Sequence, residues 1–165
     1  MTTERRLVLL RHAKSDWTHD VADLDRPLGE RGRRQAREAG RWLGANLDRV
    51  DVAVVSPARR TRSTWELAAA ELDVPPDVWV DERVYAASDR ELLEVVRALP
   101  DDRVTAVMVG HNPGLEDLLA HLTGGEATMP SSAIAVVALP GGWASAGDGP
   151  GSVLASGRPP RSGLG

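Results

Sequence analysis

The stretch LVLLRHAKSDW, from Leu7 to Trp17, joins four apolar residues directly to an arginine and a histidine. A second stretch, VMVGHNPGL from Val107 to Leu115, repeats this arrangement about a hundred residues later. Short continuous apolar runs are typical of strands that are covered on both faces of a sheet. Because charged groups avoid such an interior, we expect both strands to end where their polar residues begin.

Similar runs predict further strands at 52–55, 78–84, 104–109 and 134–139. Between them, apolar residues recur at helical spacing, as in Ala36, Ala39, Trp42, Leu43 and Leu47 and again in Leu115, Leu118, Leu119 and Leu122. The sequence SDRE, from Ser88 to Glu91, has the form of a capping box and predicts a helix start. Alternating strands and helices predict an α/β fold, a three-layer sandwich whose mostly parallel central sheet is flanked by helices.

The chain of 165 residues suits a single domain spanning 1–165. Its last part, from Pro140 onward, is rich in glycine and proline. There Val153 and Leu154 could form a short edge strand, and Trp143 could anchor the segment. We expect about 158–165 to be a disordered tail.

Composition excludes several classes of protein. The net charge of −4 argues against a nucleic-acid binder, and the absence of cysteine excludes disulfides, thiolate catalysis and cysteine zinc sites. No apolar run approaches the roughly 18 residues of a membrane-spanning helix, and the N-terminus lacks the apolar block of a signal peptide. These features predict a cytoplasmic protein without a membrane partner.

Two strand ends carry histidines. At the first, Arg11 and His12 can share one site only if the strand stops near Arg11, because neighbouring strand residues face opposite sides. The alternative is an arginine that reaches solvent beside a hydrogen-bonded turn histidine. At the second, Asn112 is expected to cap a helix that starts at Pro113, just after His111. The alternative there is a capping turn with an incidental histidine.

A third strand end carries arginines. In SPARRTRST, Ser56 is expected to cap a helix whose first residue is Pro57. Arginines in the first turn, such as Arg59 and Arg60, oppose the helix dipole unless an anion binds there. A solvated surface cluster is the alternative.

The carboxyl ends of parallel strands meet at one edge of a sheet, where ligands usually bind. Two histidines and at least two arginines at that edge predict a pocket for a dianion such as phosphate. Nearby arginines lower the pKa of an imidazole, and a neutral imidazole can act as a nucleophile. Of the other histidines, His19 could border the pocket and His121 is expected to be exposed.

The sequences that follow the three strands resemble motifs of a known enzyme family. RHAKS, SPARRTRST and GHNPGL resemble the histidine phosphatase superfamily, branch 1. RHAKSDW, DRPLGERGRRQA and VMVGHNPGLEDLL resemble its SixA-like group of phosphohistidine phosphatases. The match runs in order from about Leu7 to Leu139 and implies a phosphoglycerate mutase-like fold. It implies that His12 attacks phosphorus and becomes phosphorylated, that Arg11, Arg60 and His111 hold the phosphoryl oxygens, and that water then hydrolyses the intermediate.

The resemblance also implies that no metal and no cofactor are needed. It places Arg60 rather than Arg59 in the site, so that Arg59 and Arg62 face outward and could meet a substrate protein. Larger relatives carry a glutamate that protonates the leaving group, and Glu82 falls roughly where that residue would be. The chain departs from the commoner form of the first motif by having Ala13 and Lys14 after the histidine.

The leading hypothesis is therefore a metal-independent phosphatase that acts through a phosphohistidine intermediate on phosphohistidine in proteins. A phosphatase of a small phosphoester, such as a sugar phosphate, is the first alternative. A non-catalytic phosphate-binding module is the second, although the retained His12 argues against it. A metal site built from His12, His111 and Asp16 is the third, and the flanking arginines disfavour it. The sequence predicts no oligomeric state.

Overall fold

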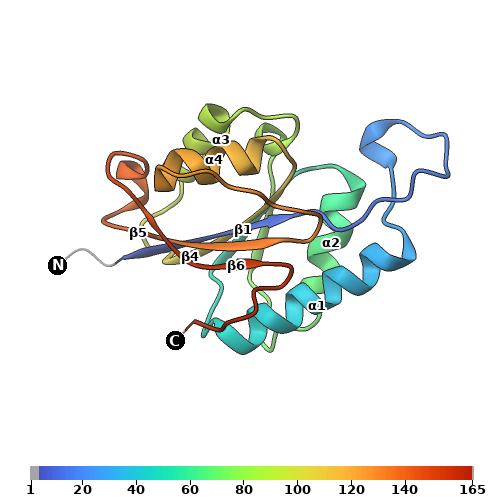
Figure 1. Cartoon of the computed structure of the whole chain (residues 1–165), viewed down its shortest axis with the longest axis horizontal. Coiled ribbons are helices and arrows are strands. Elements are labelled where there is room, and N and C mark those ends of the chain that lie inside the picture. The colour runs from blue at the N-terminus through green and yellow to red at the C-terminus, as the bar shows by residue number, and fades with distance from the viewer. Residues whose placement is uncertain (1–3, 165) are drawn as a thin grey trace.

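The computed structural model describes residues 4–164, which form one six-stranded sheet in the order β3-β2-β4-β1-β5-β6 (Figure 1). The first four strands in this order run parallel, β5 is antiparallel to β1, and β6 is antiparallel to β5. The predicted mostly parallel α/β sheet is thereby confirmed. The strands are β1 (Arg5–Arg11), β2 (Val52–Val55), β3 (Asp77–Val80), β4 (Thr105–Gly110), β5 (Ile134–Leu139) and β6 (Ser152–Gly157).

Helices cover both faces of the sheet, which gives the three predicted layers. Figure 1 shows α3 and α4 on one face and α1 and α2 on the other. Alternate residues of each central strand enter two separate apolar clusters, as Leu7 and Leu9 do on the α3–α4 side and Val8 and Leu10 on the α1–α2 side. The helices are α1 (Glu30–Asn46), α2 (Arg59–Ala69), α3 (Asp89–Arg97) and α4 (Gly114–Thr123), with short 3-10 turns η1 (Asp23–Asp25), η2 (Glu82–Val84) and η3 (Trp143–Ser145).

Several local predictions are confirmed. The capping box that opens α3 forms in both directions between Ser88 and Glu91. The sequence Val153-Leu154 lies in β6 at the edge of the sheet, and Trp143 is fully buried. The strand predicted over 78–84 ends at Val80 instead, because the Asp81 carboxylate accepts a hydrogen bond from the Arg83 N–H and turns the chain into η2.

Two predicted helix starts are wrong by one or two residues. The N-cap of α2 is Ala58, not Ser56, and the N-cap of α4 is Pro113, not Asn112. In both cases the polar side chain has a distant partner. Ser56 Oγ lies 2.8 Å from Nε2 of His111, and Nδ2 of Asn112 donates to the Met129 carbonyl. At Asn112 a long-range contact takes the place of the local cap, whereas Ser56 Oγ also accepts the Ala58 N–H at 3.4 Å.

The end of the chain follows β6. Pro160 is buried, and Leu164 packs against the apolar cluster under α1 and α2. The expected disorder of about 158–165 stays a prediction, as does the single domain over 1–165, and the last residue lies outside the described part. Within residues 4–164, no helix is both long and apolar enough to cross a bilayer.

Candidate active site

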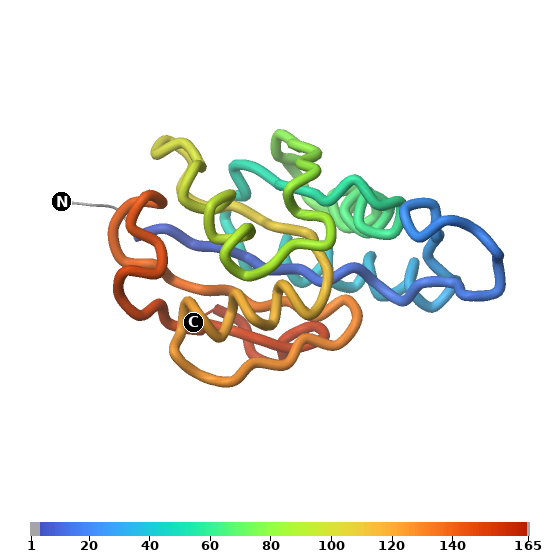
Figure 2. The backbone as a smooth tube through the Cα atoms, turned by 90° about the horizontal axis from the view of Figure 1, so that it is seen from above, coloured from blue at the N-terminus to red at the C-terminus, as the bar shows by residue number. Residues whose placement is uncertain are grey.

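Three strands end at the same edge of the sheet and carry the predicted site residues there. Backbone hydrogen bonds join the segments that follow these strands: His12 N–H donates to the Gly110 carbonyl, and Ser56 N–H donates to the Val109 carbonyl, both at 3.1 Å. β1 ends at Arg11, as the side-chain argument required. In Figures 1 and 2 this edge faces the projecting segment between β1 and α1, drawn in blue.

The His12 imidazole is buried, and its partners fix its protonation. Its Nδ1 lies 2.8 Å from the Ala13 carbonyl oxygen, which can only accept, so Nδ1 carries the proton. The unprotonated nitrogen is therefore Nε2. Burial, reinforced by the charges of Arg60 and Arg11, lowers the pKa of His12 from 6.5 to about 4. At neutral pH this imidazole is uncharged and has a free lone pair.

Two helices hold the loop after His12. The Ala13 N–H donates to Thr64 Oγ1 on α2 at 3.0 Å, and the Thr64 hydroxyl donates to the Arg60 carbonyl at 2.7 Å. At the start of α1, Gly29 N–H donates to the Lys14 carbonyl at 3.0 Å. A Cβ on Gly32 would overlap the same carbonyl, so glycine lets α1 approach this loop. The nucleophile candidate thus sits on a loop fixed from both sides.

Arg60 lies in the first turn of α2, is buried, and faces the two histidines. Its guanidinium donates to His111 Nδ1 at 3.3 Å. Since a guanidinium can only donate, His111 Nδ1 accepts and the proton is on Nε2, which donates to Ser56 Oγ. Burial, followed by the charge of Arg60, lowers the pKa of His111 to about 3. The His12 and His111 ring centroids are 5.3 Å apart.

Arg11 completes a small hollow at this edge. Its guanidinium donates to the Met129 carbonyl at 3.1 Å, and burial lowers its pKa. The hollow has a volume of about 180 Å³ and is lined by Arg11, His12, Lys14, Ser15, Trp17, Asp23, Arg60 and Ser131. A neighbouring hollow of about 490 Å³ shares Asp23 and Arg60 with it and is lined also by Tyr85 and His111. The structure therefore brings the four predicted residues together across two adjoining hollows.

Asp23 and Tyr85 belong to this cluster, although the sequence analysis missed them. Arg60 donates to the Asp23 carboxylate at 3.0 Å and to its carbonyl at 2.7 Å, and the Tyr85 hydroxyl donates to the same carboxylate. The hydrogen bond from Tyr85 lowers the pKa of Asp23 and raises that of Tyr85. Tyr85 also packs edge-on against His111, with ring centroids 5.5 Å apart.

One signal could have found Tyr85: it is the sole tyrosine of the chain, and it follows a predicted strand. Asp23 lies in a loop without periodicity, where spacing gives no indication of its partners.

Other candidates lie away from the cluster. Glu82 is exposed and, among residues 4–164, is not one of those that line either hollow. His19 is exposed and pairs with Asp16, while His121 is exposed on α4 and pairs with Asp89. Arg59 and Arg62 are exposed, and Arg62 donates to the Pro57 carbonyl. Arg60 is thus the arginine of SPARRTRST that faces the histidines.

Across the described range 4–164, no three histidines, aspartates or glutamates are grouped so as to hold a metal ion. In particular, Asp16 accepts hydrogen bonds from Thr18. It lines a separate hollow, which neither His12 nor His111 lines. The metal site considered from the sequence would need all three of these side chains together.

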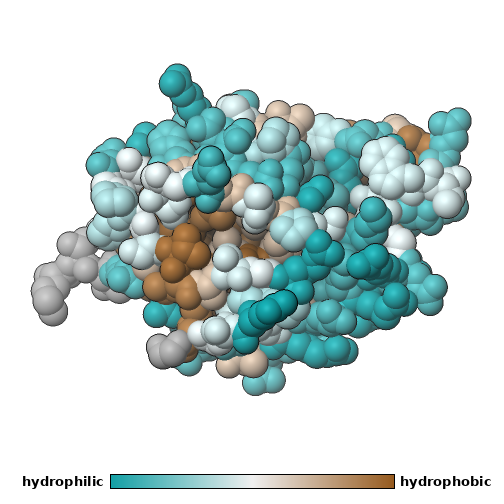
Figure 3. Space-filling model, in the orientation of Figure 1, coloured by the Kyte–Doolittle hydropathy of each residue, from teal (hydrophilic) through white to brown (hydrophobic). Residues whose placement is uncertain are grey.

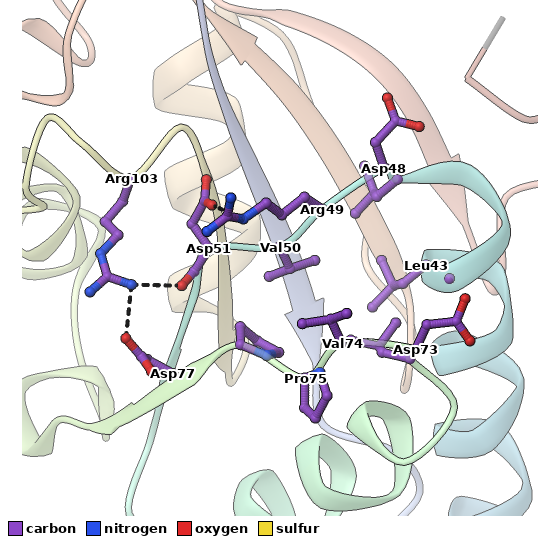
Figure 4. A pocket seen from close by; sticks show the side chains of 14 residues that line it. Leu43, Asp48, Arg49, Val50, Asp51, Asp73, Val74, Pro75, Asp77 and Arg103 are labelled. Atoms are coloured by element: carbon purple, nitrogen blue, oxygen red, sulfur yellow. Dashed lines mark hydrogen bonds and ion pairs between the residues drawn. The ribbon is translucent and has the colours of Figure 1, made fainter.

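A further hollow, of about 400 Å³, lies where β2 and β3 begin, at the end of these strands opposite the histidines (Figure 4). Its charged groups bind one another: Arg103 donates to the Asp51 carbonyl and the Asp77 carboxylate, and Arg49 pairs with Asp51. Four aspartates, Asp48, Asp51, Asp73 and Asp77, also line this hollow, so their negative charge disfavours an anion there.

Sequence comparison relates this chain to a known family of enzymes. The sequence profile of the histidine phosphatase superfamily (branch 1) matches residues 7–84. An uncharacterised protein of Mycobacterium tuberculosis is 39% identical over 146 residues, which cover 82% of this chain and 90% of the relative. The chain belongs to branch 1 of the histidine phosphatase superfamily.

Solved structures of this superfamily share the fold. A protein of Nakamurella multipartitia provisionally named phosphohistidine phosphatase SixA superimposes with a TM-score of 0.85 at 29% identity, covering 96% of this chain and 98% of that one. The protein histidine phosphatase SixA complexed with tungstate gives a TM-score of 0.79 at 23% identity, covering 92% of this chain and 95% of that one, a likeness of fold. The chain is accordingly a SixA-like member of the superfamily and a phosphatase, a hydrolase.

Proposed function

We propose that this histidine phosphatase hydrolyses phosphohistidine in proteins through a covalent phosphohistidine on His12. The observation that carries the proposal is the fixed tautomer of His12, whose Nδ1–H is bound by the Ala13 carbonyl and whose Nε2 keeps its lone pair beside Arg11 and Arg60. A neutral nucleophile next to two guanidinium groups suits attack on a phosphoryl dianion.

In the first step, the Nε2 lone pair of His12 forms a bond to phosphorus while the P–N bond of the substrate breaks. The departing imidazole of the substrate keeps the electron pair of that bond and takes up a proton. In the second step, a water oxygen attacks the phosphohistidine, the His12–phosphorus bond breaks, and orthophosphate leaves as His12 recovers its lone pair. Arg11 and Arg60 hold the phosphoryl oxygens, whose charge must be neutralised in both steps. His111 joins them when its Nε2–H turns from Ser56 Oγ to a phosphoryl oxygen.

The proton for the leaving group comes from solvent or from a protein acid. A ring nitrogen of an imidazole leaving group is basic enough to take this proton from water, so a protein acid is needed less than for an ester. Glu82 stays the predicted donor for esters, although it is exposed. Replacement of Glu82 by Gln tests it: a role as donor requires kcat on an alkyl phosphate to fall by about tenfold or more, with a smaller loss on phosphohistidine.

Shape supports a substrate carried by a protein. Pockets that enclose small-molecule ligands usually measure about 300–1,000 Å³. The hollow beside His12, at about 180 Å³, is large enough to enclose little beyond a phosphoryl group. The rest of the substrate then remains outside, as a phosphorylated side chain on a protein surface would.

A small phosphoester is the second candidate, because the neighbouring hollow of about 490 Å³ shares Arg60 with the first and could accept a compact organic group. Side-by-side measurement of kcat/KM separates the two candidates. A higher kcat/KM on a histidine-phosphorylated protein supports the proposal, and a higher value on a sugar phosphate replaces it with the second candidate.

The covalent intermediate is tested by trapping. Wild type is mixed with a histidine-phosphorylated protein labelled with ³²P and quenched in alkali, in which phosphohistidine survives. We expect label on the wild-type chain, none on His12→Ala, and wild-type labelling of His121→Ala, which removes an exposed histidine outside the cluster. Label that persists on His12→Ala would refute the proposed nucleophile.

A further inference from the structure

The mouth of the hollow beside His12 carries an exposed tryptophan. Trp17 lines this hollow together with His12 and Arg60, yet it is 69% exposed. Val21 and Leu24, on the same projecting segment, are also exposed, and Figure 3 shows apolar surface in brown at this end of the molecule. Because the Trp17 indole is mostly exposed, it buries little apolar area and contributes little to the stability of the fold. Its place beside the hollow suits a role in binding a ligand instead.

One face of the Trp17 ring is already used. The Arg26 guanidinium lies over it, 3.6 Å from the ring centroid, a separation typical of a cation–π contact. This contact restrains an indole that otherwise lies mostly in solvent. Because a ring has two faces and Arg26 covers only one, the exposed remainder leaves the opposite face open to a ligand.

We infer that Trp17 is a specificity-determining residue whose open face stacks on the planar ring that carries the phosphoryl group, the imidazole of phosphohistidine. This inference rests on the proposed function. A hollow of about 180 Å³ that takes the phosphoryl group leaves the attached ring at the mouth, where Trp17 lies. Offset stacking of two planar rings stabilises such a contact beyond the area that it buries.

The test compares two substrates that share a P–N bond, a phosphohistidine peptide and phosphoramidate, which has no ring. In Trp17→Ala we expect the ratio of kcat/KM for the peptide to that for phosphoramidate to fall by about threefold to tenfold, the range for one aromatic pair. Trp17→Phe keeps a stacking ring and should hold the ratio within about twofold of wild type.

Trp79 offers a matched control. It is a second partly exposed tryptophan, 37% exposed on β3, with the Arg103 guanidinium 5.3 Å from its ring centroid, and it is not among the residues that line the two hollows of the site. Trp79→Ala should leave the ratio unchanged. The inference is overturned if Trp17→Ala leaves the ratio at the wild-type value, or lowers it no more than Trp79→Ala does.

Binding separates this inference from the proposed function. A peptide with a phosphonate on a triazole ring mimics phosphohistidine without turning over, and its Kd is measured by calorimetry on wild type and Trp17→Ala. We expect Kd to rise by about threefold to tenfold in the variant, with the Kd of orthophosphate less affected. If wild type hydrolyses no phosphohistidine, the proposed function fails, while the two peptide Kd values still decide the role of Trp17: equal values overturn it.

Discussion

At the scale of single residues, the chemistry of the site follows from which group each nitrogen faces. His12 and His111 differ in tautomer because one faces a carbonyl and the other a guanidinium. Both are neutral at physiological pH, since burial and nearby arginines lower their pKa values to about 4 and about 3. The sequence motifs identified both histidines. Only their hydrogen-bond partners in the folded chain determine which ring nitrogen is unprotonated.

The pKa of His12 predicts the acid limb of activity. Protonation of His12 removes the lone pair, so kcat/KM should fall as the pH drops through about 4, not through the ordinary 6.5. A pH profile of kcat/KM on phosphoramidate measures this limb. A midpoint near 6.5 would mean that His12 is not desolvated in the free enzyme.

Asp23 predicts a change in anion affinity. Its carboxylate pairs with the Arg60 guanidinium and, like a phosphoryl dianion, is negatively charged. Asp23→Asn should therefore lower the inhibition constant of orthophosphate, by about threefold to tenfold, because one competing charge is removed. Asp16→Asn is the matched control, since Asp16 bonds Thr18 and lines another hollow. An unchanged constant in Asp23→Asn, or an equal shift in both variants, contradicts the prediction.

At the scale of elements, α1 and α2 position the loop after β1. Gly32 brings α1 against the Lys14 carbonyl, where a Cβ would overlap it. Gly32→Ala should lower the free energy of unfolding by about 1–3 kcal/mol, a typical overpacking cost, and reduce kcat by moving the loop that carries His12. Gly44→Ala, in the same helix with its nearest neighbour at 3.3 Å, should cost less. Urea unfolding and kcat on both variants check this, and equal losses would contradict it.

Thr64 makes the corresponding link from α2. Thr64→Val keeps the side-chain shape but leaves the buried Ala13 N–H without its acceptor. Such a loss costs about 1–3 kcal/mol of unfolding free energy. Thr64→Ser keeps the hydroxyl and should recover most of that stability. If Thr64→Val is as stable as Thr64→Ser in urea, the hydrogen bond to Ala13 does not hold the loop.

At the scale of the whole molecule, the buried neutral histidines connect folding to pH. In the unfolded chain both titrate near 6.5, while in the folded chain they titrate near 4 and 3. Between these values the unfolded chain binds more protons, so the free energy of unfolding should decrease as the pH falls from about 6.5 toward about 3. The free energy of unfolding in urea is measured at pH 7 and at pH 4.5 for wild type and for His12→Gln. The difference between the two proteins in the change with pH gives the contribution of His12. Parallel pH dependence in the two proteins would contradict this origin.

The sheet and its two helical layers could be predicted from sequence because apolar runs and helical spacing are local patterns that burial on both faces imposes. The same holds for the capping box at Ser88, which is completed within four residues. The helix starts near Ser56 and Asn112 could not be predicted in this way. Their side chains bind His111 and the Met129 carbonyl, which no local pattern brings near, and neither side chain caps the helix as predicted.

By itself, then, the sequence determined where the central strands lie and which charged residues stand at their ends, since the cost of burying charge keeps such residues out of the strand interior. Tertiary structure alone decided that Asp23 and Tyr85 meet Arg60, that Glu82 points to solvent, and that Trp17 stands open at the mouth of the hollow. The reason is that these contacts join loops distant in the chain, whose positions depend on how α1 and α2 pack against the sheet.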